Sequence, residues 1–226
     1  MANPYKQIMG DELADVFWAL GNEVHFLSRL YDDSRHLFGD GSENRVRMMN
    51  KAAPAFFHRV QITFERELML GICRVTDPVS TGNKENLTVL RLDQMLEQCS
   101  VGLRKGVKVR AESARVASEF ARDWRNRWLA HKDLELSVEA PSARPLSAAT
   151  LGKIDVALTA LDDVLKSVST VFNGNGAGFR GITQYGGSAS LIRVIDEGLR
   201  ARDQRTARIQ AGSATEDDLA HFTPST

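Results

Sequence analysis

Apolar residues recur along most of the chain at the three- and four-residue spacing of an amphipathic α-helix, whereas strand-like alternation is rare. One such stripe covers residues 11–38 and ends at the turn-forming residues 39–42. A second stripe covers residues 46–75, and we expect this helix to be interrupted near Pro54 because proline removes a backbone donor. The pair Asp77-Pro78 ends it, since the residue before proline disfavours helical torsion angles.

The rest of the chain continues the helical pattern. The elements expected after the second stripe are a polar loop at 79–86, a short helix at 87–99, a long helix from about 103 to 131, a connection with two prolines at 134–145, a helix at 151–172 that Ser147 caps, a loop rich in glycine and asparagine at 173–187 and a helix at 188–210. The predicted fold is therefore all-α: an up-and-down helical bundle of four or five long helices with a C-terminal helical extension. We assign residues 1–175 to the bundle and residues 176–226 to a loop, a helix and a frayed acidic tail.

Composition narrows the class of protein. Lys+Arg and Asp+Glu both number 29, so no global field draws the molecule to nucleic acid or to a membrane, and any electrostatic recognition must be local. No apolar run approaches the length of a membrane helix or a signal peptide. The two cysteines, Cys73 and Cys99, are too few for a disulfide scaffold or a zinc site, and no metal-ligand cluster is present. We therefore expect a cytoplasmic protein without a membrane segment, metal or cofactor.

The segment 116–131 carries the most distinctive chemistry. On a wheel with about 100° per residue, one wide stripe is formed by Ala117, Phe120, Ala121, Trp124 and Trp128. The same stripe contains His131, near Trp124. Arg125 and Arg127 fall at the two edges of that stripe. An imidazole can transfer protons at physiological pH, and a guanidinium suits a phosphate group and its developing negative charge.

Local charge supports a phosphate ligand. Residues 101–132 contain nine basic and three acidic side chains within a protein that is neutral as a whole. Arg122, Arg127 and Lys132 are the candidate RNA-binding residues. A structural interpretation competes with this one: Trp124, Trp128 and His131 would be core residues, and the arginines would form a solvated helix face with acidic ion-pair partners.

The run Arg125-Asn126 followed by His131 resembles the signature of the HEPN superfamily (higher eukaryotes and prokaryotes nucleotide-binding). The block 67–78, which ends in Arg-Val-Thr-Asp-Pro, is similar to that of the AbiU-like abortive-infection branch, and so are residues 86–88 and 125–133. The resemblance covers roughly residues 10–172. Within the first of these blocks, we expect Arg74 and Asp77 to form an ion pair at the helix end.

The resemblance implies a HEPN-like bundle that forms a homodimer and cleaves RNA without a metal ion, in phage defence or in a toxin–antitoxin system. Arg125 and His131 would then be the catalytic residues: His131 would transfer a proton at the 2′-hydroxyl or the 5′-oxygen, and Arg125 would stabilise the charged phosphate. Asn126 would support them by orienting the motif. Products would carry 2′,3′-cyclic phosphate and 5′-hydroxyl ends. An antitoxin partner is compatible with this class, but Asp133 stands where some HEPN toxins carry the tyrosine that a nucleotidyltransferase modifies.

Three interpretations remain open at this point. The favoured one is the endoribonuclease, and the second is a non-catalytic HEPN module that binds RNA or nucleotide as a sensor or scaffold. The third is the purely structural role of the motif. The wheel separates Arg125 and His131 by about 120°, so a dimer in which one chain's arginine meets the other chain's histidine is a further hypothesis.

Overall fold

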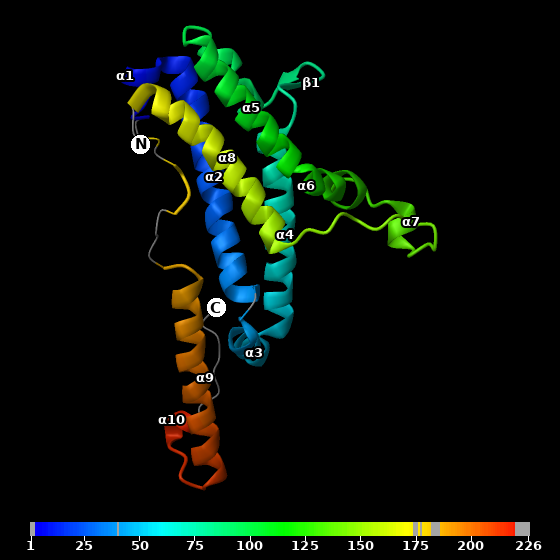
Figure 1. Cartoon of the computed structure of the whole chain (residues 1–226). Coiled ribbons are helices and arrows are strands. Elements are labelled where there is room, and N and C mark those ends of the chain that lie inside the picture. Colours follow the sequence, from blue (N-terminus) through cyan, green and yellow to red (C-terminus); the bar gives the residue numbers. More distant parts are fainter. Residues whose placement is uncertain (1–2, 40, 174–175, 177, 182–185, 220–226) are drawn as a thin grey trace. The chain divides into compact units, whose positions relative to one another are not determined.

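The computed structural model describes residues 3–39, 41–173, 176, 178–181 and 186–219, and the all-α fold is confirmed (Figure 1). A single two-stranded hairpin, β1 (Ser80–Thr81) with β2 (Lys84–Glu85), is the exception among these residues. The helices are α1 (Lys6–Met9), α2 (Asp11–Phe38), α3 (Glu43–Ala52), α4 (Pro54–Thr76), the 3₁₀ turns η1 (Val89–Arg91) and η2 (Gln94–Leu96), α5 (Val101–Ala117), α6 (Glu119–Trp124), the π-helical η3 (Arg125–Leu129), α7 (Leu134–Ser137), α8 (Leu151–Asn173), α9 (Ser188–Gln210) and α10 (Glu216–Leu219).

The chain forms two compact units. The first consists of Met1–Arg35 and Ile62–Thr183, and the second of His36–Gln61 and Gln184–Thr226, so the division falls within α2 and α4. The boundary that we placed after residue 175 stays a prediction about domain organisation.

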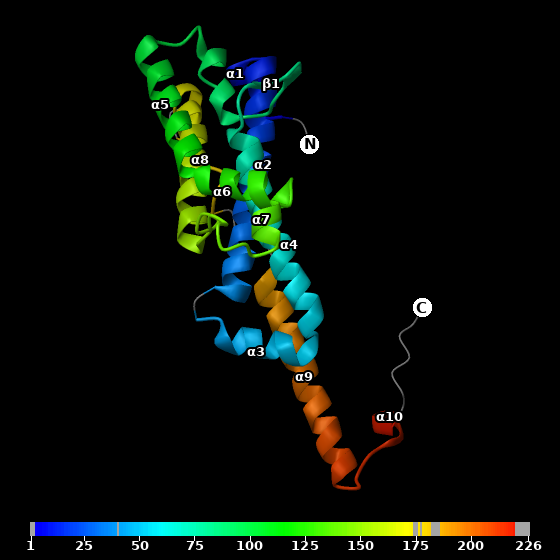
Figure 2. The ribbon, with the colours of Figure 1, turned by 90° about the vertical axis from the view of Figure 1, so that its right-hand side faces the viewer.

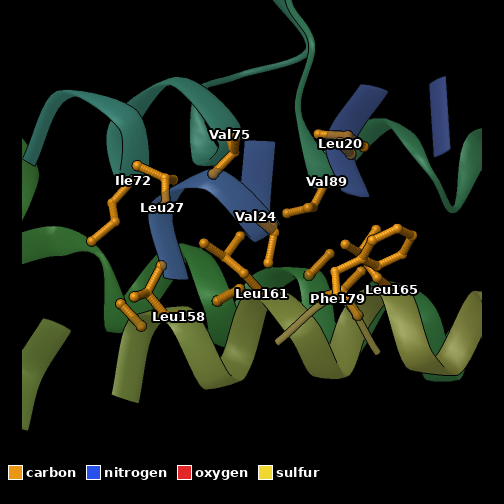
Figure 3. Packing of buried hydrophobic residues seen from close by; sticks show 14 of the residues in the cluster. Leu20, Val24, Leu27, Ile72, Val75, Val89, Leu158, Leu161, Leu165 and Phe179 are labelled. Atoms are coloured by element: carbon orange, nitrogen blue, oxygen red, sulfur yellow. The ribbon is translucent and has the colours of Figure 1, made fainter. Parts of the chain in front are cut away.

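The first unit is a bundle in which α2, α4, α5 and α8 share one hydrophobic core. The predicted stripe of α2 is buried along its whole length, from Leu13 to Tyr31. Figure 3 shows how its middle part meets the other helices. The labelled contacts are made by Leu20, Val24 and Leu27 of α2, Ile72 and Val75 of α4, and Leu158, Leu161 and Leu165 of α8. Burial of these apolar side chains is the main force that holds the bundle together.

The predicted interruption near Pro54 is confirmed, whereas the predicted helix at 87–99 differs from the structure. The stripe at 46–75 is divided into α3 and α4 at Ala53, and Pro54 begins α4, because a first-turn proline needs no helical hydrogen-bond donor. Phe57 is buried, but Phe56 is exposed and is not a core residue. The segment 87–99 is not a regular helix: it consists of η1 and η2, whose apolar residues still reach the core. Thr88 begins this segment by accepting a hydrogen bond from the Leu90 amide.

The start of α8 also differs from the prediction. Thr150 caps the helix, because its Oγ1 accepts a hydrogen bond of 3.2 Å from the Lys153 amide. Ser147, the predicted cap, instead accepts a hydrogen bond from Trp124 Nε1 at 2.7 Å through its carbonyl. Ser147 therefore does not begin α8, and its hydrogen bond instead fixes the connection that precedes α8 to Trp124.

A segment after α8 completes the core of the first unit. The Phe179 ring packs against α2 so closely that a methyl group at Gly21 would overlap it. Its amide donates to Asp162 Oδ1 at 2.7 Å, and its carbonyl lies 3.1 Å from His25 Nδ1. The backbone around Phe179 is thus bonded both to α8 and to α2.

The second unit contains α3, α9 and α10. The predicted helix at 188–210 is confirmed as α9, none of whose residues is buried, and Arg202 donates from Nη1 to the Lys51 carbonyl at 3.3 Å. The acidic residues that we expected in a frayed tail instead form the short helix α10. Within it, Asp218 accepts hydrogen bonds from Arg208. Residues 220–226 lie outside the described residues. Among the helices described, none is both long and apolar enough to cross a membrane.

The core predicts a clear stability difference within α8. Leu161 is fully buried, so Leu161→Ala should lower the free energy of unfolding by about 2–5 kcal/mol, because it leaves a cavity. Val156 lies on the same helix with 59% of its surface exposed, so Val156→Ala should change it by less than about 0.5 kcal/mol. Urea unfolding followed by circular dichroism measures both. Equal losses would contradict the assignment of the buried face.

Candidate functional site

The predicted helix at 103–131 is in fact three consecutive segments. Ser100 Oγ accepts a hydrogen bond from the Leu103 amide and begins α5, which ends at Ala117. Ser118 is buried, and its hydroxyl donates to the Ala114 carbonyl at 2.7 Å, a contact that bends helices. Beyond it, α6 directs the chain toward the segment that carries the motif. Figure 2 turns α6 and α7 toward the viewer, in front of the bundle.

The motif begins in a π-helical turn. The Ala130 amide donates to the Arg125 carbonyl at 2.8 Å, which is a bond across five residues instead of four. The Asp133 amide then reaches back to the Arg127 carbonyl at 2.9 Å and ends the turn. Single π turns are rare within helices and occur frequently at functional sites, because they change the direction of the side chains that follow.

This turn overturns the predicted position of His131. The wheel placed His131 in an apolar seam, but the helix ends at Leu129 and His131 is exposed at the bend that follows. Within the part of the chain that the structure describes, its imidazole has no hydrogen-bond or ion-pair partner. Trp124 does pack against the core, whereas the Trp128 ring lies under Lys132 Nζ, 3.5 Å from the ring centroid.

Arg125 is held by the end of α4. Its Nη1 donates to both oxygens of the Asp77 carboxylate at 2.7 Å, and its Nε donates to Asn126 Oδ1 at 3.1 Å. Arg122 joins the same carboxylate at 3.5 Å and donates from Nη2 to the Thr76 carbonyl at 2.9 Å. Two arginines therefore share one partly buried acidic group beside the motif.

Arg127 braces the connection between the motif and α8. Its guanidinium lies 3.5 Å from Asp123 and 3.4 Å from Asp133, and it donates to the carbonyl of Arg144 at 2.5 Å. Asp123 in turn accepts from the Ser147 amide at 2.8 Å. These contacts give Arg127 a structural role, and its RNA-binding role stays a prediction.

The same network changes the acidity of Asp123. Burial raises the pKa of this carboxyl, but the hydrogen bond from the Ser147 amide and the charges of Arg127 and Arg144 outweigh burial, so the pKa is lowered. The charged form of Asp123 is therefore the form that the folded chain stabilises.

The structure groups the predicted residues differently from the sequence. Arg125, Asn126 and Arg122 come together around Asp77, whereas Arg127 belongs to a second network and no contact joins Arg125 to His131 within the described chain. The predicted pairing of Arg74 with Asp77 is wrong. Arg74 pairs instead with Glu67 at 2.6 Å and with Glu23 at 3.7 Å, and Asp77 is the partner that sequence reasoning missed for the motif.

Two cavities are lined by residues that contact the motif or precede it, but neither is lined by the motif itself. One, of about 250 Å³, is lined by residues of α2, the end of α4 and the hairpin region, and Asp77 forms part of its wall. The other, of about 810 Å³, lies along α5, α6 and the start of α8, with Asp123 and Arg144 in its lining. Among the described residues, no group of three or more His, Cys, Asp or Glu side chains is placed to hold a metal ion.

The chain thus combines an all-α bundle with the Arg-Asn…His motif that resembles the signature of the HEPN class. The family model described as AbiU2, a HEPN family, matches residues 11–184, and the chain belongs to this family. The matched range includes the bundle, Asp77 and the whole motif. No curated protein and no solved structure shows a significant match.

The lowered pKa of Asp123 predicts a pH-dependent contribution to stability. A depressed folded pKa means that the stabilisation is present above the unfolded value of about 4 and is lost as the pH falls through the folded value. Asp123→Asn should therefore cost about 1–3 kcal/mol of unfolding free energy at pH 7 and less at pH 3, which lies below the unfolded pKa. Urea unfolding at both pH values measures this.

The matched control is Asp163→Asn on α8. Asp163 is 53% exposed and lies 3.7 Å from Lys166, so its loss should have little effect at either pH. A cost of Asp123→Asn that is the same at pH 7 and pH 3 would show that its charge does not stabilise the fold.

Proposed function

We propose that this AbiU2-type HEPN module is a metal-independent endoribonuclease of a phage-defence or toxin–antitoxin system. The observation that carries the proposal is the π turn, which holds Arg125 at Asp77 and leaves His131 exposed and without a partner in the described chain. A general acid–base group must be accessible to substrate, and a phosphate-binding arginine must be fixed in place. Membership of a HEPN family supports RNA as the proposed substrate class for this pair.

In the proposed reaction His131 removes the proton of a ribose 2′-hydroxyl. The 2′-oxygen bonds to the adjacent phosphorus, the bond from phosphorus to the 5′-oxygen breaks, and the leaving oxygen takes up a proton from an imidazolium. Arg125 stabilises the negative charge that grows on the phosphate oxygens. Products carry a 2′,3′-cyclic phosphate and a 5′-hydroxyl, and Asn126 supports the arginine through its contact with Nε.

The site is completed in a homodimer. Within the described part of one chain, Arg125 faces Asp77 and makes no contact with His131. The residues next to the motif expose apolar surface, with Leu134 at 74% and Val138 at 63%, as expected of a surface that a partner covers. A second copy brings its own Arg125 toward this His131. An antitoxin partner and a cytoplasmic location stay predictions from the sequence.

Removal of the imidazole tests the reaction. His131→Ala should lower RNA cleavage by at least about 100-fold, because general acid–base catalysis contributes roughly that much. The unfolding free energy should change by less than about 0.5 kcal/mol, since His131 is exposed. Cleavage is measured in excess EDTA with sequencing of 5′-hydroxyl ends. The control His58→Ala, an exposed histidine of α4, should retain full activity.

Cleavage that survives His131→Ala would contradict the assigned role. A wild-type protein that binds RNA but produces no new 5′-hydroxyl ends would instead support a non-catalytic binding module. The cavity of about 250 Å³ that Asp77 helps to line is the feature that favours this second candidate, because its wall contains charged and polar side chains and includes the ion-pair partner of Arg125.

Complementation tests the shared site. Mixing Arg125→Ala chains with His131→Ala chains should restore roughly a quarter of the wild-type activity if subunits exchange and each site needs one residue from each chain. A heterodimer then contains one intact site of two, and half of all dimers are mixed. Cross-linking confirms the exchange. No recovery in mixtures that contain heterodimers would show that each chain holds a complete site.

A further inference from the structure

Asp77 lies where the end of α4 meets the motif, and its surroundings fix it in place. Pro78 follows it and ends α4, and the Thr76 hydroxyl donates to the Ile72 carbonyl at 2.8 Å. The side chain of Asp77 is only 20% exposed. A carboxylate on such a rigid helix end can hold a partner in one orientation.

Arg125 is the partner that Asp77 holds most closely. Both carboxylate oxygens accept from Nη1 at 2.7 Å, and Nε is occupied by Asn126. Nη2 has no acceptor within the described residues, and the Arg125 side chain is 27% exposed. Two of the three guanidinium nitrogens are therefore used to fix the group, and the third remains available to a ligand oxygen.

The cluster of Asp77, Arg122 and Arg125 has a net positive charge and therefore favours an anionic ligand. Asp77 carries one negative charge and is shared by Arg125 and Arg122, so the three groups together keep one positive charge. Arg122 is itself tied to the Thr76 carbonyl, and its Nη1 is buried with no acceptor in the described chain. Asp77 thus orients the arginines without cancelling their charge.

We infer that Asp77 is a positioning residue for the reaction: it fixes the Arg125 guanidinium so that Nη2 meets the scissile phosphate. This inference rests on the proposed ribonuclease function. It differs from a masking role, in which Asp77 would compete with RNA for Arg125, and from a structural role, in which the ion pair would only stabilise the fold. The three roles predict different combinations of change in turnover, RNA affinity and unfolding free energy for the same substitution of Asp77.

The test compares Asp77→Asn with wild type in two measurements. The turnover number for RNA cleavage should fall about 10–100-fold, because a released arginine samples other orientations. Affinity for a non-cleavable 2′-O-methyl oligonucleotide should stay the same or increase up to a few-fold, because a negative charge is removed. The matched control is Asp155→Asn, which breaks another aspartate–arginine pair of 2.7 Å in the same unit and should change neither quantity.

Three other outcomes for Asp77→Asn would overturn the inference, and each identifies a different role for Asp77. Increases in both turnover and affinity show that Asp77 masks Arg125, and an unchanged turnover shows that it does not position it. Parallel losses of turnover, affinity and unfolding free energy show a structural role. Asp77→Glu keeps the charge but displaces it by one methylene, so its turnover should lie between those of the wild type and Asp77→Asn.

A spectroscopic readout separates this inference from the proposed function. NMR of the Arg125 side chain should show distinct Nη1 and Nη2 signals in the wild type, because the ion pair hinders rotation, and these should merge in Asp77→Asn. If the wild type shows the distinct signals but cleaves no RNA, the ribonuclease proposal fails while the orienting contact stands. Signals that are unchanged by Asp77→Asn overturn the inference whatever the activity.

Discussion

The ion pair between Asp77 and Arg125 joins the end of α4 to a turn that lies 48 residues further along the chain. A π turn is less favourable than regular helix, so its survival at the motif requires contacts from outside the helix. Asp77 supplies one of them, and the hydrogen bonds that link Trp124 and Asp123 to Ser147 supply the others. The motif is thus placed by the fold on two sides: by α4 on one and by the connection to α8 on the other.

The sequence predicts those features of the fold that depend on neighbouring residues better than those that depend on which helices are adjacent in space. The bounds of α2 follow from an uninterrupted apolar stripe, because periodic burial leaves little freedom in where the helix begins or ends. The wheel fails after Arg125, since it assumes a constant turn and the π turn adds a residue. Asp77 was identified as part of a family-like block, but its pairing with Arg125 instead of Arg74 depends on which helices are adjacent in space. The cap of α8 at Thr150 shows the same limit at short range, because Ser147 was an equally suitable residue type.

Charge counted along the sequence overstates the positive charge that this region offers to RNA. Among the basic residues of the segment 101–132, Arg115 is paired with Glu112 and Glu119 of the same helix, as local spacing predicts. Arg127 is paired with Asp123 within the segment and with Asp133 just beyond it. Arg125 is paired with Asp77, which lies far outside the segment, so a count of neighbouring residues does not include this acid. The fold therefore turns a broad basic segment into a small number of oriented groups, which suits recognition of one phosphate better than tracking of a long strand.

The segment that carries Phe179 has a consequence for evolution of the chain. Its ring fills space over Gly21 that the four helices leave open, and its backbone is bonded to both α2 and α8. A gene that ended with the last codon of α8 would encode the helices of the bundle but not Phe179, which is part of their shared core. Insertions or deletions in the link after α8 are constrained by the distance over which Phe179 must return to α2, and Gly21 cannot acquire a side chain unless the ring is displaced. The shortest sequence that encodes a complete core therefore extends beyond the last helix of the bundle. The family match, which continues to residue 184, agrees with this.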